Sequence, residues 1–359
     1  MLPAVGKRFG QLAKGRRTRS RVFSATDHVA REFAARHGDL PFGLNRCGDP
    51  PFTARCLPRR RFRLTSRRQT ARRPPPQIPA IERVCGVDYS GAAASGKSAW
   101  IAECDVGPSL ALRRLASLGR LAGSNDRDAV NEWLVEQITG SQKTAWAMDF
   151  PFGLPIELKL GGWQPQLRLI RHFDGDAKAL GRHLVERCQT LSGSMHIRRQ
   201  TDVETATPFD CFHYRIIYQT FHGMRDVLAP LGRHGHVAVW PFQYGNVDAD
   251  AVVMETCPSS VLKELKLPRR MYKQSGGRIP AAVHIKTRQT ILRGLRPWVE
   301  ISAYQRRIIM KDPGGDALDA VLAAVGGHQA FLHADHRRIA GDRRYPREGY
   351  VYCGPIHED

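Results

Sequence analysis

The residues best suited to chemistry are acids that end apolar stretches of the chain. Four such stretches lead, in chain order, into Asp88, Asp149, Glu255 and the pair Asp316 and Asp319. An acid at the end of a buried strand lies at the edge of the sheet, where crevices form in open α/β sheets. Any one of them alone is more often a turn or helix-capping residue. Several together predict a site for hard cations such as Mg²⁺ or Mn²⁺, which take oxygen ligands.

The last two acids lie in a segment with strong helical periodicity. Its sequence, "DPGGDALDAVLAAV", predicts a helix after Pro313, with apolar residues from Leu318 to Val325 spaced along one face. Asp316 and Asp319 fall on the opposite side, where their neighbours are alanines. Small residues around two acids indicate a face that packs closely against another element, and a solvent-exposed face is the alternative. Two carboxylates one helical turn apart repel each other, and a bound cation would relieve that repulsion.

A second pattern, just after Asp88, would place the chemistry elsewhere. Gly91 to Ser98 spells G-x-x-x-x-G-K-S, the phosphate-binding loop of nucleotide hydrolases, in which Lys97 would contact phosphate. Such a loop must run into a helix whose N-terminal amides receive the phosphates. The segment 99–106 instead alternates in the manner of a strand. We therefore expect a hairpin here and keep nucleotide binding as an alternative function.

The wider pattern predicts one α/β domain over residues 79–359, with a mainly helical insertion at about 156–235. Strands are expected at 84–90, 98–106, 111–118, 144–149, 237–242, 251–255 and 349–353. Helices are expected at 126–139, 176–188, 209–231, 259–265, 285–295, 299–309 and after Pro313. The acids that follow strands would then meet at the edge of a sheet.

Basic charge is concentrated in the N-terminal part of the chain. The 359 residues have a formal net charge of +21, and residues 1–78 hold 19 Lys and Arg against 4 Asp and Glu. Arginine runs, three consecutive prolines and a lack of periodicity predict that this segment is a disordered tail. Three interpretations fit this segment: a nucleic-acid-binding arm, an organellar transit segment and an over-extended start of the reading frame. We favour an origin other than a dedicated binding arm.

Cysteine usage and hydropathy narrow the class of protein. The eight cysteines show no C-x-x-C pair and no regular spacing, so neither a zinc knuckle nor a disulfide framework is indicated and reduced thiols are expected. No apolar run reaches the roughly 18 residues needed to span a bilayer, and the N-terminus lacks the apolar core of a secretory signal. We therefore expect a cytoplasmic protein that does not enter a membrane.

A series of motifs, taken in order, resembles a known family. The motifs are "GVDYSGA", "MDFPFGLP", "RRQTDVETATPF", "METCPSSVLK", "GDALDAVLAA" and "EGYVY". Over about residues 83–355 they are similar to the domain-of-unknown-function 429 family of predicted RNase H-like nucleases. The resemblance implies an RNase H-like α/β fold, in which a mixed sheet opens with a β-hairpin, helices cover both faces and a metal site lies at the centre.

The resemblance also implies a set of site residues. Nucleases of the RNase H-like superfamily carry an Asp on the first strand, an acid at the end of the fourth, and one or two acids on a late helix. Matched in order, the implied catalytic residues and metal ligands are Asp88, Asp149, Asp316 and Asp319. Glu255 lies in a further motif and is expected to be catalytic. The implied function is hydrolysis of phosphodiester bonds in DNA or RNA by two Mg²⁺ or Mn²⁺ ions.

Basic residues in or near these motifs are expected to line the path of the substrate. They are Arg199, Lys273, Lys286 and Arg288, which would contact phosphates. An ordinary surface charge or an ion pair explains each of them equally well. A non-catalytic nucleic-acid-binding protein of the same fold is the remaining class. It has little support, because no aromatic cluster for stacking bases is evident.

Overall fold

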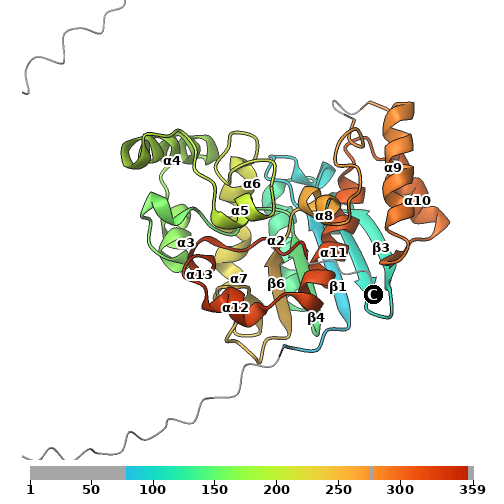
Figure 1. The fold of residues 1–359 in the computed structure, drawn as a ribbon, viewed down its shortest axis with the longest axis horizontal. Helices are drawn as coiled ribbons and strands as arrows, with labels where there is room; N and C mark the ends of the chain where they lie inside the picture. Colours follow the sequence, from blue (N-terminus) through green and yellow to red (C-terminus); the bar gives the residue numbers. More distant parts are fainter. Residues whose placement is uncertain (1–77, 275–277, 355–359) are drawn as a thin grey trace, which may run out of the picture. The chain divides into compact units, whose positions relative to one another are not determined.

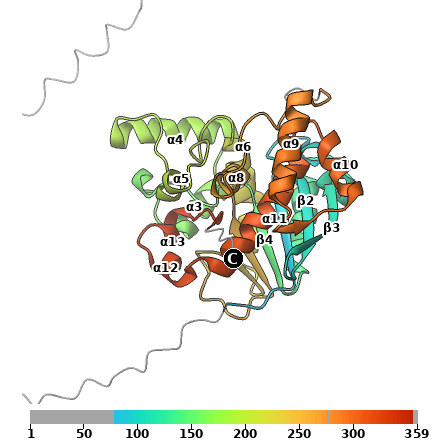
Figure 2. The ribbon, with the colours of Figure 1, turned by 45° about the vertical axis from the view of Figure 1, so that its right-hand side comes forward.

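The structure is a computed structural model that describes residues 78–274 and 278–354 (Figure 1, Figure 2). These residues form an α/β fold around one mixed sheet of seven strands, in the order β5-β6-β4-β1-β2-β3-β7. The predicted disordered tail lies outside the described residues, apart from Ile78. Among the described helices, none combines the length and the apolar character that crossing a bilayer requires.

Hydrogen bonding fixes the direction of each strand. The strands are β1 (Arg83–Asp88), β2 (Trp100–Asp105), β3 (Leu110–Ser117), β4 (Thr144–Met148), β5 (Val237–Val239), β6 (Ala251–Glu255) and β7 (Val299–Glu300). β1 pairs with β2 and β2 with β3 in antiparallel fashion, so the sheet opens with the predicted hairpin. On the other side of β1, strands β4, β6 and β5 run parallel to it. β1, β4 and β6 therefore end at the same edge of the sheet.

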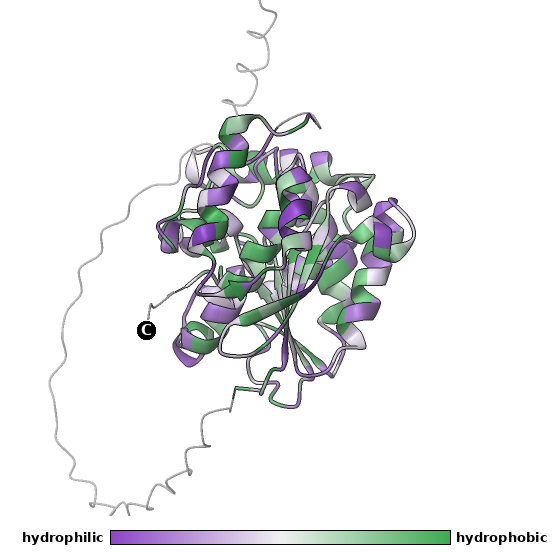
Figure 3. Cartoon of the chain, turned by 90° about the vertical axis from the view of Figure 1, so that its right-hand side faces the viewer, coloured by the Kyte–Doolittle hydropathy of each residue, from purple (hydrophilic) through white to green (hydrophobic). Residues whose placement is uncertain are grey.

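Helices cover both faces of the sheet. They are α1 (Leu118–Ala122), α2 (Arg127–Thr139), α3 (Trp163–Arg171), α4 (Ala177–Ser192), α5 (Gln200–Glu204), α6 (Ile217–His222), α7 (Ala229–Leu231), α8 (Pro258–Glu264), α9 (Ala282–Gly294), α10 (Ala303–Lys311), α11 (Asp316–His333), α12 (His336–Gly341) and α13 (Tyr345–Glu348). Along β1, Val84 packs into the core shared with α11, whereas Cys85 and Val87 pack into the core shared with α2. Hydrophobic residues accordingly concentrate on the strands and on the helix faces turned toward them (Figure 3).

α11 runs unusually close to the sheet. It packs against β1, β2 and β4 and is buried over almost its whole length. Gly86 of β1 makes this approach possible, because a Cβ at that position would lie 2.8 Å from the Cα of Ala324. The alanines beside Asp319 thus belong to a closely packed face, as the sequence indicated. The solvent-exposed alternative for this face is wrong.

Residues 299–309 and 349–353 differ from their predicted structures. The first segment forms β7 and then α10, because the hydroxyl of Ser302 caps a new helix by accepting a hydrogen bond of 3.3 Å from the amide of Gln305. The second forms a single bridge to β6 in place of a strand. Every regular element described in the region Ile156–Leu231 is a helix, including the π-helix between α6 and α7, but the helix predicted at 209–231 begins only at Ile217, because residues 209–216 form a connection.

We predict that Gly86→Ala destabilises the protein, because the new methyl group would meet the backbone of α11. Overpacking of this kind lowers the free energy of unfolding by about 1–3 kcal/mol, and urea unfolding followed by circular dichroism measures it. Gly235→Ala is the matched control, since a Cβ at Gly235 would meet nothing within 4 Å. Equal stability of the two variants would contradict the close contact between α11 and β1.

Candidate active site

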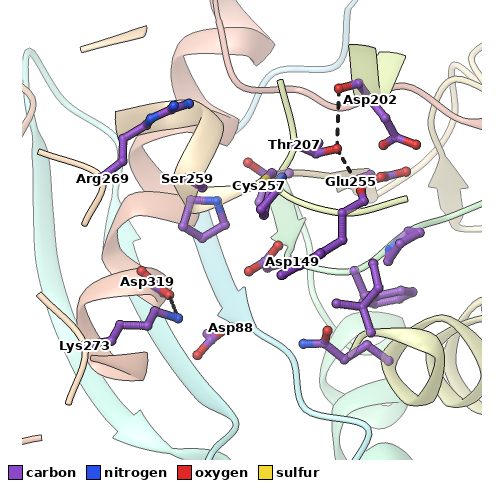
Figure 4. Close-up of a pocket in the computed structure, with 18 of the residues that line it drawn as sticks. Asp88, Asp149, Asp202, Thr207, Glu255, Cys257, Ser259, Arg269, Lys273 and Asp319 are labelled. Atoms are coloured by element: carbon purple, nitrogen blue, oxygen red, sulfur yellow. Dashed lines mark hydrogen bonds and ion pairs between the residues drawn. The ribbon is translucent and has the colours of Figure 1, made fainter. Parts of the chain in front are cut away.

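Acids from three separate elements converge on one cavity of about 400 Å³. Asp88 ends β1, Asp149 follows β4, and Asp319 lies in the first turn of α11. In the parallel pair of β1 and β4, Val87 lies opposite Met148, so Asp88 and Asp149 occupy neighbouring positions at the edge of the sheet. Figure 4 shows the three carboxylates around the same space. The structure therefore brings together three of the four acids expected to bind metal.

The fourth of these acids, Asp316, is the first residue of α11 and does not line the cavity. Its charge nevertheless contributes to raising the pKa of Asp88. Burial raises the pKa of Asp316 itself to about 7; the charge of Lys273 opposes this rise, and the charges of Asp312 and Asp319 add to it. Asp316 therefore belongs to the same charged cluster without lining its cavity.

Asp88 and Asp319 are buried, Asp149 and Asp316 are half-buried, and the negative charge of these acids is only partly compensated. Asp88 and Asp319 are 7% and 2% exposed. Burial raises the pKa of Asp88 well above its ordinary range, with Lys273 opposing the rise and the other acids adding to it. The pKa of Asp149 rises to about 8, first through burial and then through the charge of Asp319. Carboxylates held together away from water favour either a proton or a bound cation.

Asp319 has two partners from the connection between α8 and α9. The ammonium of Lys273 forms an ion pair with it, and the hydroxyl of Tyr272 donates a hydrogen bond of 2.9 Å to its other oxygen. In the part of the chain that the structure describes, no group donates a hydrogen bond to the side chain of Asp88 or Asp149. The Lys273 side chain is 47% exposed, so it also borders the solvent at the mouth of the cavity.

The carboxylate oxygens that line the cavity are the type of ligand that a hard divalent cation takes. Residues 78–274 and 278–354 contain no group of three or more His, Cys, Asp or Glu side chains already spaced to hold a metal ion. The carboxylate oxygens of Asp88, Asp149 and Asp319 are the ligands that Mg²⁺ and Mn²⁺ prefer, and the first two lack a hydrogen-bond donor. The ammonium of Lys273 supplies part of the positive charge that a metal ion would bring.

Glu255 and Arg199 bind each other inside the protein. Arg199 is 1% exposed, and its guanidinium bonds Glu255 at 2.5 and 2.8 Å and Asp202 at 2.7 and 3.0 Å. Another of its N–H groups reaches the carbonyl of Glu348 at 3.1 Å. We predicted a phosphate contact for Arg199 and a catalytic role for Glu255. The structure places both in an internal ion-pair cluster in the wall of the cavity, where every N–H group of the guanidinium is already bonded.

The remaining predicted phosphate contacts lie away from the cavity, apart from Lys273. Arg288 is fully buried on α9 and donates hydrogen bonds to backbone carbonyls that include those of Tyr272 and Asp312, so it holds the chain that leads into α11. Lys286 is exposed on α9 and does not line the cavity. Arg269, which no sequence signal marked, lines the cavity and is exposed, and no hydrogen bond or ion pair to a described residue engages it.

The Gly91–Ser98 segment forms the turn of the hairpin. It contains a short 3-10 helix, Ser95–Lys97, and leads into strand β2, so it lacks the following helix that a phosphate loop requires. Packing explains Gly96, since a Cβ there would lie 2.7 Å from the Cα of Gly119. The prediction of a strand after this turn is confirmed.

Comparisons with known proteins find no relative. No family model matches the chain, and no curated protein and no solved structure is similar to it. The resemblance to the 429 family therefore rests on the motifs alone.

We predict that Asp149→Asn stabilises the protein increasingly as the pH rises. An acid whose pKa is higher in the folded than in the unfolded chain makes folding less favourable as the pH rises between the two values. For Asp149 this window runs from its ordinary value of 3.8 to about 8. In EDTA, the melting temperature of the variant should match that of the parent below the window and exceed it by at least about 3 °C above it.

Asp248→Asn is the matched control for this prediction, because Asp248 is an exposed acid between β5 and β6. The melting temperature of the Asp248→Asn variant should equal that of the parent at every pH. A difference between Asp149→Asn and the parent that stays constant across the window would show that Asp149 ionises normally in the folded protein.

We predict that Arg199→Met destabilises the protein by about 3–5 kcal/mol, because it leaves the buried carboxylates of Glu255 and Asp202 without their cation. Denaturant unfolding measures this loss. Arg113→Met is the control, since Arg113 pairs with Asp105 on the surface and its removal should change the stability by at most about 1 kcal/mol. Similar small losses for both variants would show that Arg199 is free to contact a ligand.

Proposed function

We propose that the chain is a nuclease of RNase H-like fold that hydrolyses phosphodiester bonds in nucleic acid with Mg²⁺ or Mn²⁺. The observation that carries this proposal is the convergence of Asp88, Asp149 and Asp319 on one cavity with more negative charge than Lys273 compensates. Hard cations that act on phosphodiesters are held by carboxylates of this kind.

The order of the elements supports the RNase H-like assignment. The sheet opens with the β1–β2 hairpin, and β1 is its central strand. One acid ends β1, another follows β4, which is the fourth strand, and two lie at the start of the late helix α11. The resemblance to RNase H-like nucleases implies metal ligands at these positions.

The chain's own groups have separate tasks in this proposal. The metal ions, which activate water and stabilise the leaving oxygen in this class of reaction, would be held by Asp88, Asp149 and Asp319, while Asp316 adds negative charge from outside the cavity. The hydroxyl of Tyr272 orients the carboxylate of Asp319, and Lys273 neutralises it. Arg269 offers a guanidinium that no described residue engages at the cavity wall, where a phosphate of the substrate can accept its hydrogen bonds.

Cleavage assays with end-labelled DNA, RNA, hybrid and branched substrates test the proposal. We expect metal-dependent cleavage of at least one substrate, and a loss of at least about 100-fold in Asp88→Asn and in Asp319→Asn, because a ligand matters at least as much as its supporting groups. Asp248→Asn, at an exposed acid outside the cavity, should retain activity. Cleavage that survives both site substitutions would reject this site.

Metal binding gives a second readout for the same prediction. Mn²⁺ should raise the melting temperature of the parent, because a ligand that binds only the folded chain stabilises it by mass action, and it should not do so in Asp88→Asn. Nucleotide binding that is lost in Lys97→Ala and kept in Asp88→Asn would favour the nucleotide-binding alternative. Nucleic-acid binding without a metal response or cleavage would favour the non-catalytic alternative.

A further inference from the structure

An aromatic shelf borders the cavity, in the connection between α5 and α6. It consists of Phe209, His213, Tyr214 and Arg215, of which Phe209 lines the cavity itself. The rings of Phe209 and His213 are stacked, with their centroids 4.6 Å apart, and the ring of Tyr214 follows at 4.4 Å from that of His213. The guanidinium carbon of Arg215 lies 5.4 Å from the ring centroid of Phe209 and 5.7 Å from that of Tyr214.

Tyr214 and Arg215 of the shelf are exposed and Phe209 and His213 are half-buried, yet the backbone that carries them is fixed. Tyr214 is 70% exposed, and no carboxylate of a described residue pairs with Arg215, which is exposed as well. Within the same connection, Asp210 is buried, and one of its carboxylate oxygens lies 3.1 Å from Nδ1 of His196, which precedes α5. Arg198 donates a hydrogen bond of 2.9 Å to the carbonyl of Thr207. The shelf thus presents flat rings and positive charge on a well-anchored support.

A different wall of the same cavity supplies positive charge. Arg269 and Lys273 come from the connection between α8 and α9, and both line the cavity. Figure 4 shows them to the left of Asp149, with Thr207, which leads into the shelf, above it. A nucleic-acid strand in the cavity can therefore meet the cations Arg269 and Lys273, the carboxylates, and the ring of Phe209, which is stacked on the rest of the shelf.

We propose that the aromatic shelf stacks an unpaired base of single-stranded nucleic acid, whose phosphates contact Arg215, Arg269 and Lys273. Stacking on aromatic and guanidinium planes is the way proteins bind unpaired bases, and a duplex offers no free base face for it. The cations match the charge of the backbone, and the carboxylates lie where a phosphodiester would pass. The inference rests on the proposed function in one respect, namely that the bound strand is the substrate.

Binding to oligonucleotides with and without bases tests this inference. The full chain with Asp88→Asn, which blocks cleavage, is titrated by fluorescence anisotropy against a labelled single strand and against an abasic strand of equal length. We expect tighter binding of the strand with bases. Adding Tyr214→Ala should weaken that binding between about 5-fold and about 150-fold, the range for loss of one stacked base, and should leave binding of the abasic strand unchanged.

Two substitutions control the experiment. Tyr214→Phe keeps the ring and removes only the hydroxyl, which accepts a hydrogen bond of 3.2 Å from Arg215, so it should keep the preference for the strand with bases. Tyr304→Ala removes a tyrosine that is 59% exposed on α10, outside the cavity, and should change neither affinity. The basic segment 1–78 attracts any phosphate backbone in a salt-dependent way, so only the difference between the two strands, measured at several salt concentrations, reports the shelf.

The outcomes separate this inference from the proposed nuclease function. Equal affinity for the two strands, or no effect of Tyr214→Ala on the binding of the strand with bases, would overturn the shelf. Metal-dependent cleavage found together with either of these results would support the nuclease function and reject the role of the aromatic shelf. Base-dependent binding that is lost in Tyr214→Ala, without cleavage by the parent, would support the shelf and reject the nuclease.

Discussion

The close contact between α11 and β1 is the constraint on which the candidate site depends. Gly86 removes the side chain that would separate the two backbones, and Gly327 packs in the same way against Ala147 of β4. Because Asp319 lies at the start of α11 and Asp88 at the end of β1, this contact forces two like charges together. The charged cavity is thus a consequence of tight packing between rigid elements, and its acids cannot move apart unless α11 moves.

The protein holds two groups of buried acids in opposite ways. Around Arg199 every N–H group of the guanidinium is bonded, and the acids that it contacts are neutralised within the protein. Around Asp88 and Asp149 no described residue donates a hydrogen bond, and Lys273 is the cation that acts on both. Since the chain builds a complete ion-pair cluster in the wall of the same cavity, the incomplete cluster supports our proposal of a ligand that carries positive charge.

Features within a single element could be predicted from the sequence, whereas pairings between distant segments could not. Alternation after Ser98 predicted β2 and so removed the helix that a phosphate loop needs. Arg199 and Glu255 lie 56 positions apart, and no local pattern links them. The aromatic shelf was not predicted, because its rings are not evenly spaced along the chain. Only the compact connection between α5 and α6 brings them together.

Two kinds of structural element supply the residues that line the cavity. Strands and α11 supply the carboxylates, while two connections supply the cations and the rings. Rigid elements suit groups whose spacing must be kept, and connections suit groups that recognise a partner. Lys273 links the two groups of residues, because it lies on a connection and pairs with Asp319 of α11. In the proposed function, Asp319 would help to hold a metal ion, which would supply the positive charge that Lys273 supplies to it here. Lys273, whose side chain is half-exposed, would then be available to meet a phosphate, so that one side chain would link metal binding to capture of the substrate backbone.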